Sequence, residues 1–213
     1  AIPAIANTSS DNTLNFNLGS GSTLTTDSVN QRANEAATKL ISTVGLVSGT
    51  LDGDIKFQDS SNNNLSGTVD VSGGTLGAGK SIHMNGGTVN LTADGATVPA
   101  INSSTTDTTI DIQVGAGNST AASNIQFENT GNIATLTSGE LNGDIKFLNN
   151  TDNTANAAGT VNVGDGSTSG TLATGKSIFM DGGTINIKTA SATVPAVDSN
   201  SSDNTLNFNL GSG

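Results

Sequence analysis

Residues 85–91 read NGGTVNL, and residues 181–187 read DGGTINI, 96 residues further along the chain. Each copy opens with a glycine pair and continues with alternating apolar and polar residues. Alternation with a period of two places all apolar side chains on one face of a β-strand, and glycine pairs favour tight turns. This stretch therefore predicts a short strand that follows a glycine corner, in an architecture that repeats.

Other motifs return at the same offset. Pro3, Pro99 and Pro195 are the only prolines, and GKSI at residues 79–82 returns at 175–178. GDIKF at residues 53–57 returns only 90 residues later, at 143–147. The first copy is therefore longer before this motif and the second is longer after it, as expected when surface turns vary in length and strands do not.

A third copy begins near the end of the sequence, because residues 9–21 (SSDNTLNFNLGSG) return unchanged as residues 201–213. We divide the chain into repeat units 3–98 and 99–194 and the start of a third unit, 195–213, within one continuous solenoid over residues 1–213. Two explanations stay open: a window of a longer array, or a subunit that presents the same strand at both ends.

Composition excludes several classes of protein. The net charge is −11 and Arg32 is the only arginine, whereas binding to nucleic acid needs clustered basic residues. No window approaches the roughly 18 continuous apolar residues of a membrane helix, so we expect no membrane insertion by this segment. With no cysteine and His83 as the single histidine, we expect neither an enzyme nor a thiolate metal site.

Two repeat folds fit short strands of this kind. A right-handed parallel β-helix would fit four or five turns into 96 residues, and tandem immunoglobulin-like sandwiches use roughly 100 residues per domain. Sandwiches usually have longer strands and a buried Trp or a Tyr corner, and the chain has no Trp or Tyr. We therefore expect an all-β parallel β-helix, with thin layers of aliphatic residues inside and stacked Asn residues hydrogen-bonded along its axis.

One segment departs from the strand pattern. Residues 28–42 have apolar positions with helical spacing after a possible cap at Asp27 or Ser28. We interpret them as a helical insertion, which is either an ordinary loop that covers an edge or a lateral contact surface.

With the GDIKF, GKSI, GGTVN and IPA elements, the chain resembles passenger segments of bacterial autotransporter adhesins. It is most similar to the rickettsial-type outer-membrane surface antigens. The resemblance covers all 213 residues and rests on composition and repeat texture. It implies a secreted structural protein, located outside the cell or on the bacterial cell surface, that forms an adhesin stalk, an extracellular filament or a surface layer.

Two sets of residues are candidates for function. Asp52, Asp54 and Asp144 place carboxylates in turns and are weak calcium candidates, because calcium prefers six to eight oxygen ligands; no other cofactor is expected. Exposed end strands can accept another strand, so we expect self-assembly of copies end to end through six apolar residues: Leu14, Phe16, Leu18, Leu206, Phe208 and Leu210. The alternative is an adhesion module that binds host glycan or protein through a lateral face near residues 28–41.

Overall fold

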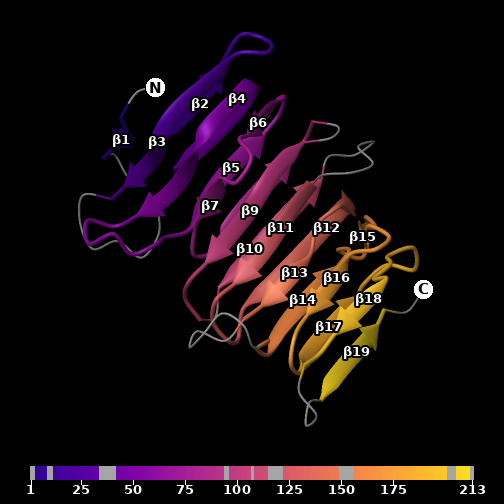
Figure 1. Cartoon of the computed structure of the whole chain (residues 1–213). Helices are drawn as coiled ribbons and strands as arrows, with labels where there is room; N and C mark the ends of the chain where they lie inside the picture. Colours follow the sequence, from indigo (N-terminus) through magenta and orange to yellow (C-terminus); the bar gives the residue numbers. More distant parts are fainter. Residues whose placement is uncertain are drawn as a thin grey trace.

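The fold is a parallel β-helix, as predicted, and its turns follow one another along a single axis (Figure 1). This computed structural model describes residues 3–8, 12–33, 42–93, 96–106, 108–114, 122–148, 156–200 and 205–211. Within these ranges the protein is all β-structure, and no helix there is long and apolar enough to cross a membrane.

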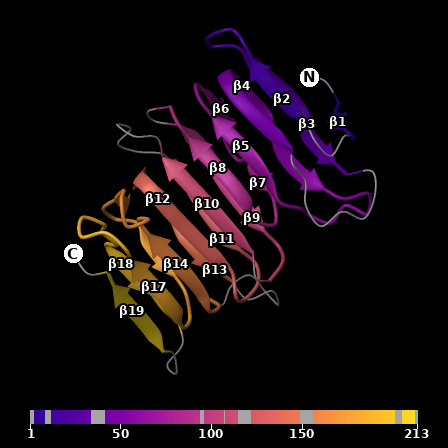
Figure 2. The same ribbon diagram turned by 180° about the vertical axis from the view of Figure 1, so that it is seen from behind.

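Two long parallel sheets form the main faces of the solenoid, and Figure 2 shows them from behind. Sheet 1 contains β2 (Thr13–Asn17), the start of β4 (Thr43–Gln58), β5 (Gly67–Val71), β8 (Gly87–Leu91), β10 (Thr109–Val114), the start of β12 (Ile133–Leu141), β14 (Gly159–Val163), β17 (Gly183–Ile187) and β19 (Leu206–Leu210). Sheet 2 contains β1 (Ile5–Asn7), the end of β3 (Thr23–Arg32), the end of β4, β7 (Ser81–His83), β9 (Thr97–Ser103), β11 (Ala122–Phe127), β13 (Ile145–Phe147), β16 (Ser177–Phe179) and β18 (Ala196–Asp198).

A shorter third face joins them in several turns. Here the start of β3 and β6 (Gly74–Leu76) pair with the middle of β4, and β15 (Gly170–Leu172) pairs with the end of β12, again in parallel. In these turns the chain runs from sheet 1 through the short face to sheet 2.

Four turns make one 96-residue period. In sheet 1, β8 is followed by β10 with Gly87 opposite Ile110, and β17 is followed by β19 with Gly183 opposite Leu206. The length change before GDIKF falls where sheet 2 leads back to sheet 1, because β3 ends at Arg32 and β4 begins at Thr43, but β11 ends at Phe127 and β12 begins at Ile133. The change after GDIKF is divided between two loops. One leads from sheet 2 back to sheet 1, from β4 to β5 and from β13 to β14, and the other leads from sheet 1 to the short face, from Val71 to Gly74 and from Val163 to Gly170.

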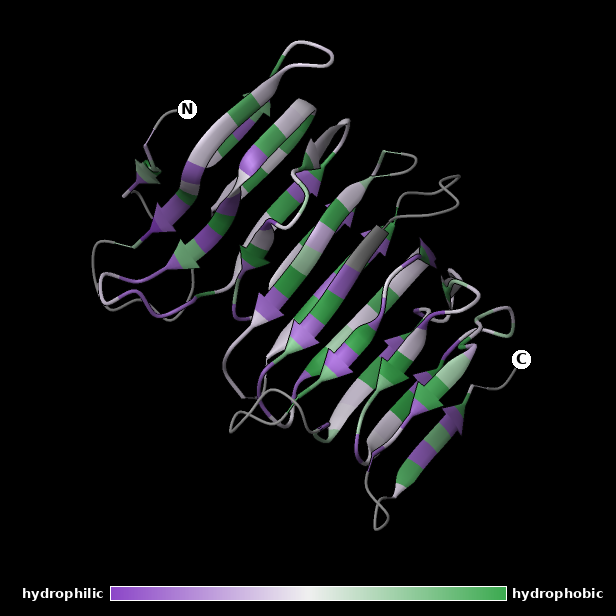
Figure 3. Ribbon diagram, in the orientation of Figure 1, coloured by the Kyte–Doolittle hydropathy of each residue, from purple (hydrophilic) through white to green (hydrophobic). Residues whose placement is uncertain are grey.

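The core is a thin stack of apolar side chains between the sheets. In β5 and β14 alternate residues are buried, and the alternation is visible as bands of colour along the strands in Figure 3. Phe57, Phe127 and Phe147 are the largest fully buried side chains, and the rings of Phe127 and Phe147 stack with their centroids 5.0 Å apart. Stability therefore comes from contacts between neighbouring turns, as in other solenoids.

The glycine corner has a steric cause. Gly87 and Gly183 have φ of 113° and 116°, a region that only glycine enters readily. A Cβ on Gly87 would also lie 2.1 Å from the carbonyl oxygen of Gly67 in the preceding turn. The GGT motif thus marks the place where one turn passes closest to the next.

The helix expected over residues 28–42 is wrong for its first part. β3 continues to Arg32, and Val29 pairs with Ile55 of the GDIKF motif; residues 34–41 lie outside the described residues. The core favours a strand here because Val29 and Gln31 both point inward and are fully buried. Spacing along the sequence suggested a helix because Gln31, a polar residue, interrupts the apolar alternation.

Candidate functional site

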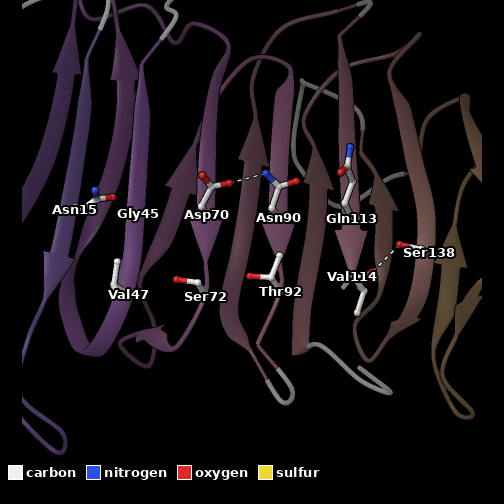
Figure 4. Close-up of a pocket in the computed structure, with 10 residues that line it drawn as sticks. All are labelled: Asn15, Gly45, Val47, Asp70, Ser72, Asn90, Thr92, Gln113, Val114 and Ser138. Atoms are coloured by element: carbon white, nitrogen blue, oxygen red, sulfur yellow. Dashed lines mark hydrogen bonds between the residues drawn. The ribbon is translucent and has the colours of Figure 1, made fainter. Parts of the chain in front are cut away.

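The outer face of sheet 1 carries a groove that crosses the strands from β2 to β12. Its volume is about 620 Å³, and Figure 4 shows two rows of lining side chains. The groove was not predicted from the sequence, because its residues come from strands that are separated by loops of varying length.

The pairing register between strands brings the residues of the first row side by side. Asn15 lies opposite Gly45, Gly45 opposite Asp70, Asp70 opposite Asn90, and Asn90 opposite Gln113. Each of these positions lies between two inward-pointing residues of its strand, so its side chain points outward. The row therefore presents amides and one carboxylate, with a gap at Gly45.

The second row comprises Val47, Ser72, Thr92, Val114 and Ser138. Val47, Ser72 and Thr92 lie two residues after Gly45, Asp70 and Asn90, whereas Val114 directly follows Gln113 and its side chain is buried. Val47 is an extra residue on β4, because Phe16 pairs with Leu46 and Asn17 pairs with Ser48. A similar irregularity lets Gln113 pair with Ser138 on β12. Such bulges redirect side chains, and this one leaves Val47 38% exposed at one end of the groove.

Part of the hydrogen-bonding capacity of the groove is already used. The side-chain amide of Asn90 donates to Asp70 Oδ1 over 2.5 Å, and the Ser138 hydroxyl donates to the carbonyl of Val114. Within the described ranges the side chains of Asn15, Ser72 and Gln113 have no partner, and Asn15 and Gln113 are exposed. A ligand in the groove would therefore meet free amide donors and acceptors at both ends.

The second repeat has no such gap. Thr135 occupies the place of Gly45, and the Asn162 amide donates to its hydroxyl over 3.2 Å. Asn186 donates to Asn162 and Asn209 donates to Asn186, each over 2.8 Å. This ladder of hydrogen-bonded asparagines confirms the stacking predicted from the sequence. In the first repeat the corresponding residues are Asp70 and Asn90, which bond to each other, and the exposed Gln113.

A second cluster of polar groups surrounds His83 on the outside of sheet 2. The Nε2 of His83 lies 3.9 Å from Asp54 Oδ2, which is also 4.0 Å from Lys56 Nζ. Burial lowers the pKa of His83, and the Asp54 carboxylate opposes part of this shift. The second repeat replaces the histidine with Phe179, whose ring centroid lies 5.1 Å from Lys146 Nζ. The cluster is thus present in one repeat only.

The calcium candidates contact protein groups. Asp54 Oδ1 accepts a hydrogen bond from the backbone N–H of Ser81 over 3.0 Å, and Asp144 Oδ1 accepts one from Ser177 over 3.1 Å. Asp52 Oδ1 lies 3.6 Å from Lys80 Nζ. In the described part of the chain, no three His, Cys, Asp or Glu side chains are grouped so that they could hold a metal ion.

The six predicted assembly residues lie on, or directly after, the two outermost strands of sheet 1. On β2 and just after it, Phe16 is buried and both Leu14 and Leu18 are half-buried. On β19, Phe208 is 54% exposed and Leu210 is 74% exposed, although both alternate in phase with core residues of β17. Among the described residues, therefore, the core is uncovered at β19.

The lateral face near residues 28–41 is described only over its first part. There the guanidinium of Arg32 donates to the side-chain oxygen of Asn62, and Asn30 donates to the hydroxyl of Ser28. These polar groups on the end of β3 bond to one another and to the loop after β4.

No protein-family model matches the chain, and neither a curated protein nor a solved structure is similar to it in sequence or fold at a significant level.

Proposed function

We propose that the chain is a structural repeat protein of the cell surface or the extracellular space, whose copies stack end to end into a filament or layer. One observation carries this proposal: β19 exposes Phe208 and Leu210, which have the phase of core residues. An unpaired strand with exposed apolar residues is a template for pairing with another chain. The Asn- and Thr-rich repeats support an extracellular location, and a chain without cysteine can cross an oxidising periplasm unfolded, because no disulfide obstructs it.

A second copy fits the two ends of the solenoid. Residues 13–18 of β2 and the turn after it have the same sequence as residues 205–210, so β2 of one copy can lie on β19 of another with Phe16 on Phe208. Identical side chains stack well in parallel, in-register strands. The same arrangement of two copies places β1 of one copy next to β18 of the other on sheet 2. Both sheets would then continue from one copy into the next.

The proposal is tested by measuring association of the purified chain. Light scattering over a range of concentrations should show growth beyond the monomer, and electron microscopy should show rods of constant width. Replacing Phe208→Ser together with Leu210→Ser should reduce association at least tenfold, because it removes the exposed apolar residues.

The matched control is Asn207→Ser with Asn209→Ser, which changes two outward-facing residues of the same strand. This control should still associate. Wild-type protein that stays monomeric at every concentration, with or without calcium, would show that copies do not stack.

A further inference from the structure

We propose that the groove on the outer face of sheet 1 binds a linear, neutral polysaccharide chain that lies across strands β2 to β10. The inference concerns a face of the solenoid, so it is independent of the proposed stacking of its ends. The inference is based on the side chains that line the groove and on the length of the row that they form.

The length of the groove suits an extended polymer. Its first row takes one residue from each of five strands, from Asn15 to Gln113. Neighbouring strands lie about 4.8 Å apart, so the row is about 19 Å long. An extended sugar chain can therefore place successive rings over successive strands.

The chemistry of the lining favours hydroxyl groups. Amides present a donor and an acceptor side by side, which matches two adjacent hydroxyls of a sugar, and Asn15 and Gln113 offer such amides at the two ends. Asp70 adds a carboxylate that accepts from hydroxyls, one oxygen of which already holds Asn90. Val47, 38% exposed, provides an apolar surface for the C–H face of a ring.

Other ligand classes fit less well. No lysine or arginine lines the groove, so an anionic polymer would meet Asp70 without a compensating positive charge. A peptide strand would need backbone partners at the edge of a sheet, but the groove lies on the face of the sheet, and the strands after β2 that line it are already paired on both sides. A lipid would need more apolar lining than Val47 supplies, because the side chain of Val114 is buried in the core.

The second repeat supplies the critical variant. Thr135 stands where the first repeat has Gly45, and Lys188 stands where it has Thr92. A Cβ on Gly45 would lie 2.2 Å from Asn15 Oδ1, which is the end of a mobile side chain, so Gly45→Thr should fold but fill the gap and displace the Asn15 amide. The backbone of Gly45 does not have a positive φ, and threonine favours strands.

Binding can be measured by isothermal titration calorimetry with neutral hexasaccharides of glucose, mannose and xylose, and with hexagalacturonate as the anionic counterpart. We expect at least one neutral hexasaccharide to bind the wild type and hexagalacturonate not to bind. Gly45→Thr should weaken binding at least tenfold, and Asn15→Ala with Gln113→Ala should do the same without filling the groove.

Thr135→Ser, in the corresponding place of the second repeat, is the matched control and should bind as the wild type does. Circular dichroism confirms that each variant is folded. The proposal is overturned if no neutral hexasaccharide binds the wild type, if hexagalacturonate binds better, or if both groove variants bind unchanged.

Discussion

Gln31 is a polar residue in an apolar core. It is fully buried, and neither polar atom of its side chain has a hydrogen-bond partner within the described ranges. The corresponding residue of the second repeat, Phe127, stacks on Phe147, whereas Gln31 lies opposite Phe57 in the same register. An unsatisfied buried amide costs about 1–3 kcal/mol, so this position weakens the first repeat.

Replacing Gln31→Leu keeps the volume of the side chain and removes the amide. We expect the free energy of unfolding to rise by about 1–3 kcal/mol, which corresponds to a Tm increase of a few degrees for a chain of this size. Thermal denaturation followed by circular dichroism measures the change. Gln126→Leu, on the outward side of β11, is the control and should give no gain; an unchanged or lower Tm for Gln31→Leu would contradict the argument.

His83 makes stability depend on pH. Its pKa is lowered in the folded protein by burial, so the unfolded chain binds the proton more tightly. Stability is therefore full above the unfolded value of about 6.5 and falls as the pH drops from there toward the folded pKa. Asp59 and Asp165 act in a lower window: hydrogen bonds, chiefly from Asn63 and Thr168 respectively, lower their pKa values, and their contribution is lost only below about pH 4.

His83→Phe copies the second repeat, where Phe179 lies next to Lys146. The variant should lose the decline in Tm that begins as the pH falls below about 6.5, because the group that titrates there is gone, and Lys56 should gain a cation–π contact. The measurement is Tm as a function of pH for both proteins. The same decline in the variant would mean that another group causes it.

At the scale of elements, the phenylalanine of each GDIKF motif is matched by a glycine of the next turn. A Cβ on Gly67 would lie 2.2 Å from the ring of Phe57, and a Cβ on Gly159 would lie 2.2 Å from the ring of Phe147. Both rings are fully buried. The GDIKF motif and the GTV strand that follows it are therefore sterically coupled in both repeats.

Gly67→Ala should lower the free energy of unfolding by about 1–3 kcal/mol, the usual cost of overpacking a core. Gly159→Ala should have a similar effect in the second repeat. Urea denaturation measures both, and Thr68→Ala, the outward-facing neighbour, serves as control with a change of a few tenths of a kcal/mol. Equal effects at Gly67 and Thr68 would show that the ring of Phe57 moves aside at little cost.

The sequence correctly predicted strands where apolar and polar residues alternate, as in residues 85–91 and 181–187. The prediction of element type failed at residues 28–32, because Gln31 interrupts the apolar alternation. Phe127, 96 residues later, is apolar at the equivalent position, and this comparison would have indicated a strand. The groove was not predictable in this way. The groove depends on the residues that pair with Gly45 on the two neighbouring strands and on the bulge at Val47. Both are set by the register between turns.

At the scale of the whole molecule, the solenoid should tolerate the loss of a complete repeat. Stability in such proteins is approximately a sum over turns and the contacts between neighbours. β19 lies on β17 in the register in which β10 lies on β8, so removing four turns joins equivalent surfaces. The sequence at the junction would also be unchanged, because Val98 would precede Pro195 as it now precedes Pro99.

Deletion of residues 99–194 should therefore give a folded protein with the same far-ultraviolet spectrum of β-structure and a lower Tm, because fewer turns remain to stabilise one another. Deletion of residues 99–186 removes eight residues fewer and is the control. It leaves an incomplete extra turn whose apolar residues cannot all reach the core, so it should melt at a lower temperature than the in-phase deletion or fail to fold. If both deletions have the same stability, the 96-residue period is not the structural unit, and contacts between neighbouring turns do not depend on the register described here.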